Sequence, residues 1–136
     1  MNEVNDVRIL VVPKTRKNPR VECFKMVKLF CQAADVELEY MMWKDNKSDK
    51  LVQKLKSMLM GMLYDDFMFQ RKVIAEVFVI DPSSVTHHVQ KNRRIKLRKG
   101  YTNYYAMYER YSDVYNEILE EMIEKLTDEK EPSYGN

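Results

Sequence analysis

One stretch of sequence decides the fold, Ile74-Ala75-Glu76-Val77-Phe78-Val79-Ile80-Asp81-Pro82-Ser83-Ser84-Val85-Thr86-His87. Asp81 followed by Pro82 pairs a preferred N-cap residue with a proline at the first helical position, which predicts a helix beginning at Pro82. The apolar spacing before it predicts a helix over residues 67–78, so that residues 79–81 form a tight turn. Two helices joined by a three-residue turn, the second polar and basic, are typical of a helix-turn-helix.

The helix that begins at Pro82 is expected to run to about Lys99, before Gly100. Val85 and Val89 lie four residues apart on one face, which predicts that this face is buried. The remaining surface near the helix start carries hydroxyls, an amide, an imidazole and a lysine: Ser83, Ser84, Thr86, His87, Gln90 and Lys91. Such side chains donate and accept hydrogen bonds at base edges, which favours insertion into the major groove of DNA.

The net charge of +2 conceals a strong asymmetry along the chain. Residues 1–108 contain 20 Lys and Arg against 12 Asp and Glu, a net charge of +8, whereas residues 109–136 contain three against nine, a net charge of −6. Residues 82–108 contain no acid and six basic residues: Lys91, Arg93, Arg94, Lys96, Arg98 and Lys99. This clustering is typical of nucleic-acid binding, and a solvated helix face is the alternative.

Residues 1–18 are predicted to form an N-terminal arm. Val7–Val12 is an apolar run that Pro13 ends, and it predicts either a short strand or an extended arm packed on the helices. A second basic cluster follows, which is expected to neutralise phosphates together with the run from Lys91 to Lys99: Lys14, Arg16, Lys17 and Arg20.

Residues 19–100 are predicted to form the helix-turn-helix domain, with three helices before the motif, over residues 19–34, 36–43 and 48–64. Ser48 is expected to cap the third of them. The residues predicted to face the core are Val21, Phe24, Val27, Leu29, Phe30, Ala33, Leu51, Val52, Leu55, Met58, Leu59, Met62, Met68, Val73, Ile74 and Val77. Three Gly and four Pro are few for an all-β fold. The sequence therefore predicts an all-α helix-turn-helix bundle of five to six helices with a long C-terminal helix.

The segment over residues 101–127 is predicted to form the last helix, whose first residue is Thr102. A flexible acidic tail is predicted over residues 128–136. The apolar stripe of this helix has the alternating spacing of three and four that is typical of a coiled coil: Tyr104, Tyr108, Tyr111, Tyr115, Ile118 and Met122. Two interpretations remain open. The helix either folds back on its own domain or forms a homodimer through residues 101–127.

Catalytic and metal-dependent functions are disfavoured by the residues present. Cys23 and Cys31 lie roughly 12 Å apart on one predicted helix, too far for a disulfide, so buried reduced thiols are expected. Two Cys and two adjacent His lack the spacing of a zinc site. His87 and His88 point about 100° apart and do not form an acid–base pair. The prediction is therefore a protein with no catalytic residue, metal or cofactor.

A membrane location is likewise disfavoured. No apolar run approaches the roughly 20 residues that cross a bilayer, and the first residues lack the apolar segment of a signal peptide. We therefore expect a cytoplasmic, nucleoid-associated protein that does not bind membranes.

The chain from Val21 to about Lys91 resembles the C-terminal DNA-binding domain of the bacterial chromosomal replication initiator DnaA, in the Trp-repressor-like helix-turn-helix superfamily. Residues 74–87 are similar to the signature I-G-x-x-F-G-R-D-H-S/T-T-V-x-H of that family. Upstream, Val52-Gln53-Lys54-Leu55-Lys56 falls where the family has I-V-x-A-R. The ATPase part of the initiator is absent, because the chain lacks a G-x₄-G-K-[ST] phosphate loop.

The resemblance implies roles for individual residues. Asp81, Ser83, Ser84 and His87 would contact bases and phosphates in the major groove. The basic loop with Lys44, Lys47 and Lys50 would reach the minor groove, and Lys56 and Lys91 would contact phosphates. The start of the first motif helix would touch the DNA backbone through Gln70, Arg71 and Lys72. Thr86, Gln90, Arg93 and Arg94 complete the predicted DNA-binding set.

The chain departs from the family at several places. Pro82 replaces a histidine that reads a base, Val79 replaces a glycine, and lysines replace the arginines of the basic loop. The DNA target of the initiator is therefore not carried over. The expected function is sequence-specific binding of double-stranded DNA, as a transcriptional regulator or a replication-associated accessory protein. The alternative is a protein-interaction module that uses the C-terminal helix and binds DNA only weakly and without sequence preference.

Overall fold

The computed structural model describes residues 16–43, 46–97 and 105–130, and in these ranges the protein is all-α, with no strand. The elements are α2 (Pro19–Ala34), α3 (Leu38–Met42), α4 (Lys50–Gly61), the π-helix η1 (Met62–Asp66), α5 (Arg71–Phe78), α6 (Pro82–Leu97) and α7 (Tyr105–Lys130). The predicted all-α class, the number of helices and the long last helix are confirmed. The predicted strand or arm over Val7–Val12 lies outside the described residues.

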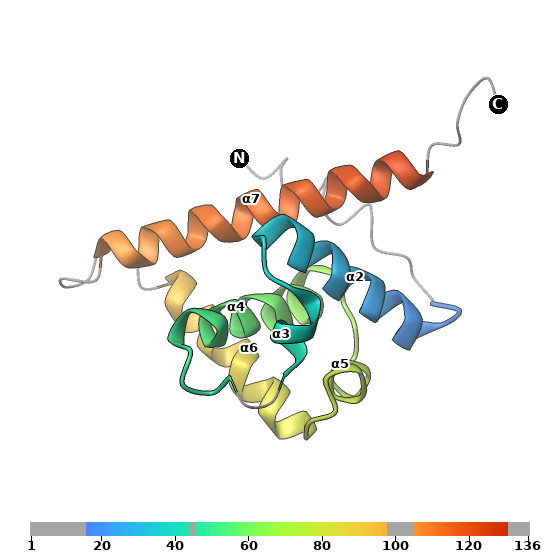
Figure 1. The fold of residues 1–136 in the computed structure, drawn as a ribbon, viewed down its shortest axis with the longest axis horizontal. Helices are drawn as coiled ribbons and strands as arrows, with labels where there is room; N and C mark the ends of the chain where they lie inside the picture. Colours follow the sequence, from blue (N-terminus) through green and yellow to red (C-terminus); the bar gives the residue numbers. More distant parts are fainter. Residues whose placement is uncertain (1–15, 44–45, 98–104, 131–136) are drawn as a thin grey trace.

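The helices form one bundle around a shared apolar core. α4 and α5 pack against α6, and α2 packs against both α5 and α7. Figure 1 shows α7 lying across the bundle, with the first turn of α6 on the far side from it. The largest fully buried side chains are Tyr115, Phe30, Phe69, Met41, Leu59, Met60, Met62, Leu63, Ile74, Leu119, Met122 and Val27. The free thiols of Cys23 and Cys31 are buried in this core, as predicted, and burial raises their pKa to about 12 and about 11.

The predicted helix-turn-helix is present, with α5 and α6 joined at residues 79–81. Val79 ends α5 in the left-handed conformation, and its amide lies near the carbonyls of Ala75 and Glu76. The amide of Ile80 donates to the carbonyl of Ala75 at 3.0 Å. The amide of Ser84 donates to the carbonyl of Asp81 at 2.9 Å, which starts α6. The turn is therefore closed by backbone hydrogen bonds on both sides.

Val79→Gly is expected to stabilise the protein by about 0.5–1 kcal/mol. The left-handed conformation (φ 57°, ψ 53°) costs an L-residue about 1–2 kcal/mol, and glycine avoids this cost. Part of the gain in stability is lost, because glycine also increases the conformational entropy of the unfolded chain. The Val79 side chain is exposed, so its removal costs little packing. Urea unfolding measures the change. Val21→Gly, at an exposed helical valine with ordinary backbone geometry, should instead destabilise by about 0.4 kcal/mol. If the stability of Val79→Gly were unchanged or lower, the backbone at Val79 would not be strained as we infer.

The predicted helix over residues 67–78 is wrong in its first turn. α4 continues into the π-helix, and α5 begins only at Arg71. Between them, Phe67 and Phe69 are buried, whereas Met68 is 64% exposed with a φ of 62°. Burial of two phenylalanines on either side of an outward methionine needs an alternating chain, which a helix does not provide. The predicted inward position of Met68 is therefore also wrong.

Most residues of α2 and α4 that were predicted to face the core are buried, whereas three are exposed. Val21 and Leu51 were expected in the core but are exposed, Leu51 by 66%, and Phe24 is also exposed. At the start of α4, the side chain of Asp49 rather than Ser48 accepts the amide of Val52, at 3.1 Å. The periodicity of a helix locates its apolar face only approximately. Packing against other helices decides which residues at the edge of that face are buried.

α7 folds back on its own domain. Four residues of the predicted stripe are buried against the rest of the same chain: Tyr111, Tyr115, Ile118 and Met122. The helix extends to Lys130, so the predicted tail over residues 128–136 begins too early. The side chains of Tyr104 and Tyr108, together with Gly100, lie outside the described residues.

Candidate nucleic-acid interface

α6 presents one apolar and one polar face. Val85, Val89 and Asn92 are buried on the inner face. The outer face carries a polar stripe in which every residue is exposed: Ser83, His87, Gln90 and Arg94. These residues are spaced by four, three and four, which places them within about 60° of one another around the helix axis at 100° per residue. The stripe is the most accessible part of the sequence-predicted site.

The start of α5 flanks the polar stripe on one side. Gln70, Arg71 and Lys72 are exposed there. Arg71 Nη1 donates to Thr86 Oγ1 at 2.7 Å, and this hydroxyl lies 3.3 Å from the carbonyl of Pro82. A hydrogen bond thus joins the N-terminal ends of the two motif helices, and it places a guanidinium beside the start of α6.

α4 flanks the other side of α6, where Ser84 and Lys91 are half-buried. Ser57 Oγ and His88 Nδ1 share a hydrogen bond of 2.7 Å. Burial lowers the pKa of His88 to about 4, helped by the positive charges of His87, Lys91 and Lys56. His88 is therefore neutral at neutral pH and joins α6 to α4 rather than lying on the exposed stripe.

Acidification is expected to destabilise the protein through His88. Its pKa is about 4 when folded and about 6.5 when unfolded, so the unfolded state binds more protons between these values. The stability is complete above about pH 6.5 and falls as the pH drops toward 4. Between pH 7 and pH 5 the loss should be about 1 kcal/mol, since partial exposure screens the full effect. Urea unfolding at both pH values measures it. An equal loss in His88→Gln, which cannot titrate, would contradict this origin.

A hydrogen-bonded loop connects α3 to α4 beside this flank. The buried Asn46 donates through Nδ2 to the carbonyl of Tyr40 at 2.6 Å. Gln53 Nε2 donates to the Asn46 carbonyl at 3.1 Å, and Tyr40 donates to Asp49 Oδ2 at 2.8 Å. This hydroxyl and the amide of Val52 hold the pKa of Asp49 below its usual range. These hydrogen bonds tie Asn46 and Asp49 to α3 and α4.

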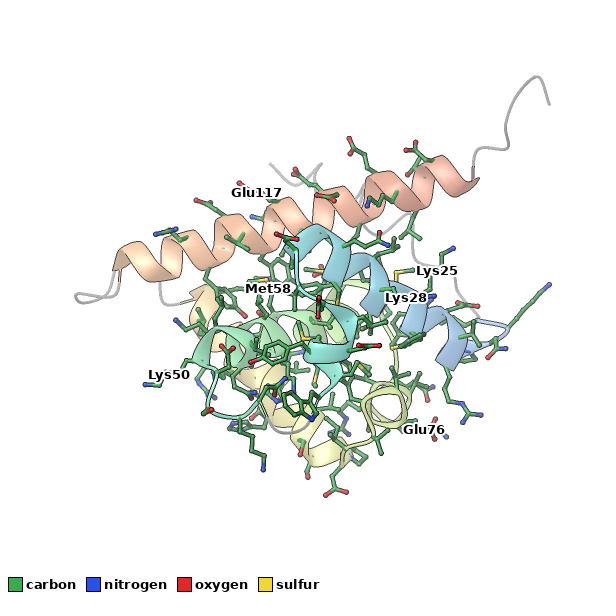
Figure 2. The ribbon with its side chains drawn as sticks, in the orientation of Figure 1. Lys25, Lys28, Lys50, Met58, Glu76 and Glu117 are labelled. Carbon is green, nitrogen blue, oxygen red and sulfur yellow. The ribbon has the colours of Figure 1, made fainter. Side chains whose placement is uncertain are left out.

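The predicted lysines of this region have different surroundings. Lys47 and Lys50 are exposed, and Figure 2 shows Lys50 projecting outward from the start of α4. Lys56 is half-buried and donates to Asn46 Oδ1 at 2.9 Å and to the Trp43 carbonyl at 3.2 Å, and burial lowers its pKa. Two of its three protons are thus used inside the protein. Lys44 lies outside the described residues.

Two predicted phosphate contacts involve arginines that already have partners. Arg93 Nε donates to Asp65 Oδ2 at 3.0 Å, and a phosphate would compete with this ion pair. Arg16 pairs with Glu22 at 3.0 Å, donates to the carbonyl of Phe67 and lies 3.7 Å from the ring centre of Phe69. Its side chain is only 12% exposed, so the expectation that Arg16 neutralises a phosphate is wrong.

The structure therefore brings most of the predicted residues onto one side of the bundle, around the first three turns of α6. Asp81, Ser83, His87 and Gln90 are exposed there, together with the start of α5. Sequence reasoning missed the bonds from Arg71 to Thr86 and from Ser57 to His88, because each joins residues far apart in the chain. The sequence showed only that these four side chains are able to form hydrogen bonds, not which pairs they form.

The described residues hold no group of three or more His, Cys, Asp and Glu able to bind a metal ion. In the same part of the chain, no helix is both long and apolar enough to cross a membrane. Comparisons with protein-family models, with curated proteins and with solved structures find no match to this chain.

Proposed function

We propose that this protein binds double-stranded DNA sequence-specifically, with α6 in the major groove, as a transcriptional regulator or a replication-associated accessory protein at the nucleoid. One observation carries the proposal. The stripe Ser83, His87, Gln90 and Arg94 is exposed along a helix whose opposite face, Val85 and Val89, is anchored in the core. A rigid helix with hydrogen-bonding side chains on its free face suits recognition of base edges.

The charge distribution supports the same orientation on DNA. Lys47, Lys50, Arg71 and Lys72 are exposed on the segments that flank α6. Figure 1 shows α5 and the first turn of α6 on the side of the bundle away from α7. The acidic residues of α7 include Glu117, which projects from the opposite part of the bundle (Figure 2). Phosphates are attracted to the first surface and repelled by the second, so the net charge of +2 underestimates the local attraction.

The resemblance to the DnaA DNA-binding domain supports the proposal through the backbone at Val79. The family has a glycine at this position, and Val79 holds the left-handed conformation that glycine favours. The chain therefore keeps the backbone geometry of such a turn although the residue differs. Pro82 in place of the base-reading histidine supports a target different from that of the initiator.

Selection from a pool of random duplexes at about 150 mM salt tests the proposal. We expect one defined motif, and a binding constant that falls steeply with salt. With about six phosphate contacts, the slope of log K against log salt should be near −5. Recovery of no motif, or binding of all duplexes alike, would refute sequence-specific recognition and leave the protein-interaction alternative.

A further inference from the structure

Trp43 is the only tryptophan of the chain, and its side chain is 54% exposed at the end of α3. Tryptophan has the largest apolar surface of any side chain, and it is enriched at interfaces, where one side of the ring meets a partner. The exposed part of the ring is therefore open to contact with a ligand.

The backbone at Trp43 is held by two hydrogen bonds, and its ring has an aromatic neighbour. The amide of Trp43 donates to the carbonyl of Tyr40 at 3.2 Å, and its own carbonyl accepts from Lys56 Nζ at 3.2 Å. The ring of Tyr40 packs against it with 6.1 Å between centres. Such preorganisation lowers the entropy lost when a ligand covers the ring.

Lys56 places Trp43 next to the α4 flank of α6. The residue after Lys56 is Ser57, which is hydrogen-bonded to His88, and the charge of Lys56 lowers the pKa of His88. Trp43 is therefore linked through α4 to the side of α6 that carries Ser84, His88 and Lys91. Lys47 and Lys50, both exposed, follow it in the loop and in the first turn of α4.

We propose that Trp43 enters the minor groove next to the major-groove site of α6 and packs as an apolar wedge against the bases. This inference rests on the proposed function. With α6 in the major groove, a loop at its flank crosses the sugar-phosphate backbone and meets the adjoining minor groove. The lysines bind the phosphates on either side, and the ring covers base and sugar surface that water otherwise solvates.

Tryptophan emission tests the inference directly, because Trp43 is the only source of that signal. Titration with the duplex obtained by selection should quench the emission in parallel with the anisotropy change of a labelled duplex. Trp43→Ala should weaken binding about tenfold or more, within the range that stacking of one base on an aromatic side chain contributes, and Trp43→Phe should retain most of the affinity. Val114→Ala, at a partly exposed apolar residue of α7, should bind like the wild type.

The outcomes separate the two proposals. If the duplex binds sequence-specifically but the emission stays constant and Trp43→Ala binds equally well, the minor-groove wedge is wrong and the proposed function stands. If no duplex binds, both are wrong. Circular dichroism at the binding temperature should show that Trp43→Ala keeps the wild-type helix content, since the backbone bonds at residue 43 do not need the ring. Weak binding with an unchanged fold then supports the wedge.

Discussion

Replacing His87 and Gln90 by alanine is expected to lower affinity for the selected duplex about hundredfold and to abolish preference for its motif. Both side chains are exposed on the polar stripe of α6. A well-formed base contact contributes about 1–3 kcal/mol of discrimination, so loss of two contacts amounts to about 2–6 kcal/mol. Fluorescence anisotropy with the selected and a scrambled duplex at about 150 mM salt measures both quantities.

Two controls distinguish readout of bases from attraction to phosphates. Gln32→Ala removes an exposed amide from α2 and should leave both affinities unchanged. Lys72→Ala removes one exposed charge at the start of α5, outside the polar stripe, and should weaken binding to both duplexes by a similar factor, with a shallower salt slope. A double variant that still prefers the selected motif would show that α6 does not read the sequence.

The second large effect concerns Gly61, where α4 crosses α6. Gly61→Ala is expected to destabilise the protein by about 2–4 kcal/mol, because overpacking and a broken buried hydrogen bond add together. A Cβ atom there would lie 2.2 Å from Asn92 Nδ2 and 2.8 Å from Asn92 Cβ. The second atom is fixed to the backbone of α6, so rotation of the side chain does not remove the clash.

Asn92 has little freedom to move away from an alanine at position 61. Its side chain is fully buried, and its Oδ1 accepts the hydroxyl of Tyr111 at 2.6 Å, which joins α6 to α7. Displacement of Asn92 therefore also breaks the contact between these two helices. The result would be a shift of the helix that we propose enters the DNA.

Chemical denaturation of Gly61→Ala, Asn92→Gly and the double variant measures the clash. Without a clash, alanine would stabilise the helix by about 1 kcal/mol relative to glycine, so even the sign of the effect is informative. In the Asn92→Gly background the alanine should cost much less, since the side chain that it meets is gone. If Gly61→Ala lowered the stability equally in the wild type and in Asn92→Gly, a clash with the Asn92 side chain would not be the cause.

The candidate site was predictable where its signals are local. Asp81-Pro82, a three-residue turn and the pair Val85 and Val89 identify α6 and its buried face without reference to the rest of the chain. The exposed residues on the opposite face follow from a period of 3.6 residues. The contacts that fix α6 in the bundle were not predictable, because Ser57 and His88 lie 31 positions apart and Gly61 and Asn92 a similar distance.

The sequence by itself determined the all-α class, the helix-turn-helix and the burial of both cysteines. Caps, prolines and apolar spacing act within one or two turns of a helix, so these features needed no knowledge of distant residues. Only the tertiary structure decided that Leu51 and Met68 are exposed, that Arg16 is enclosed and that α7 buries Tyr111 and Tyr115 against its own domain. Each of these features depends on which helices pack together. The free energy of burying a side chain comes from contacts with distant parts of the chain, which a short segment does not reveal.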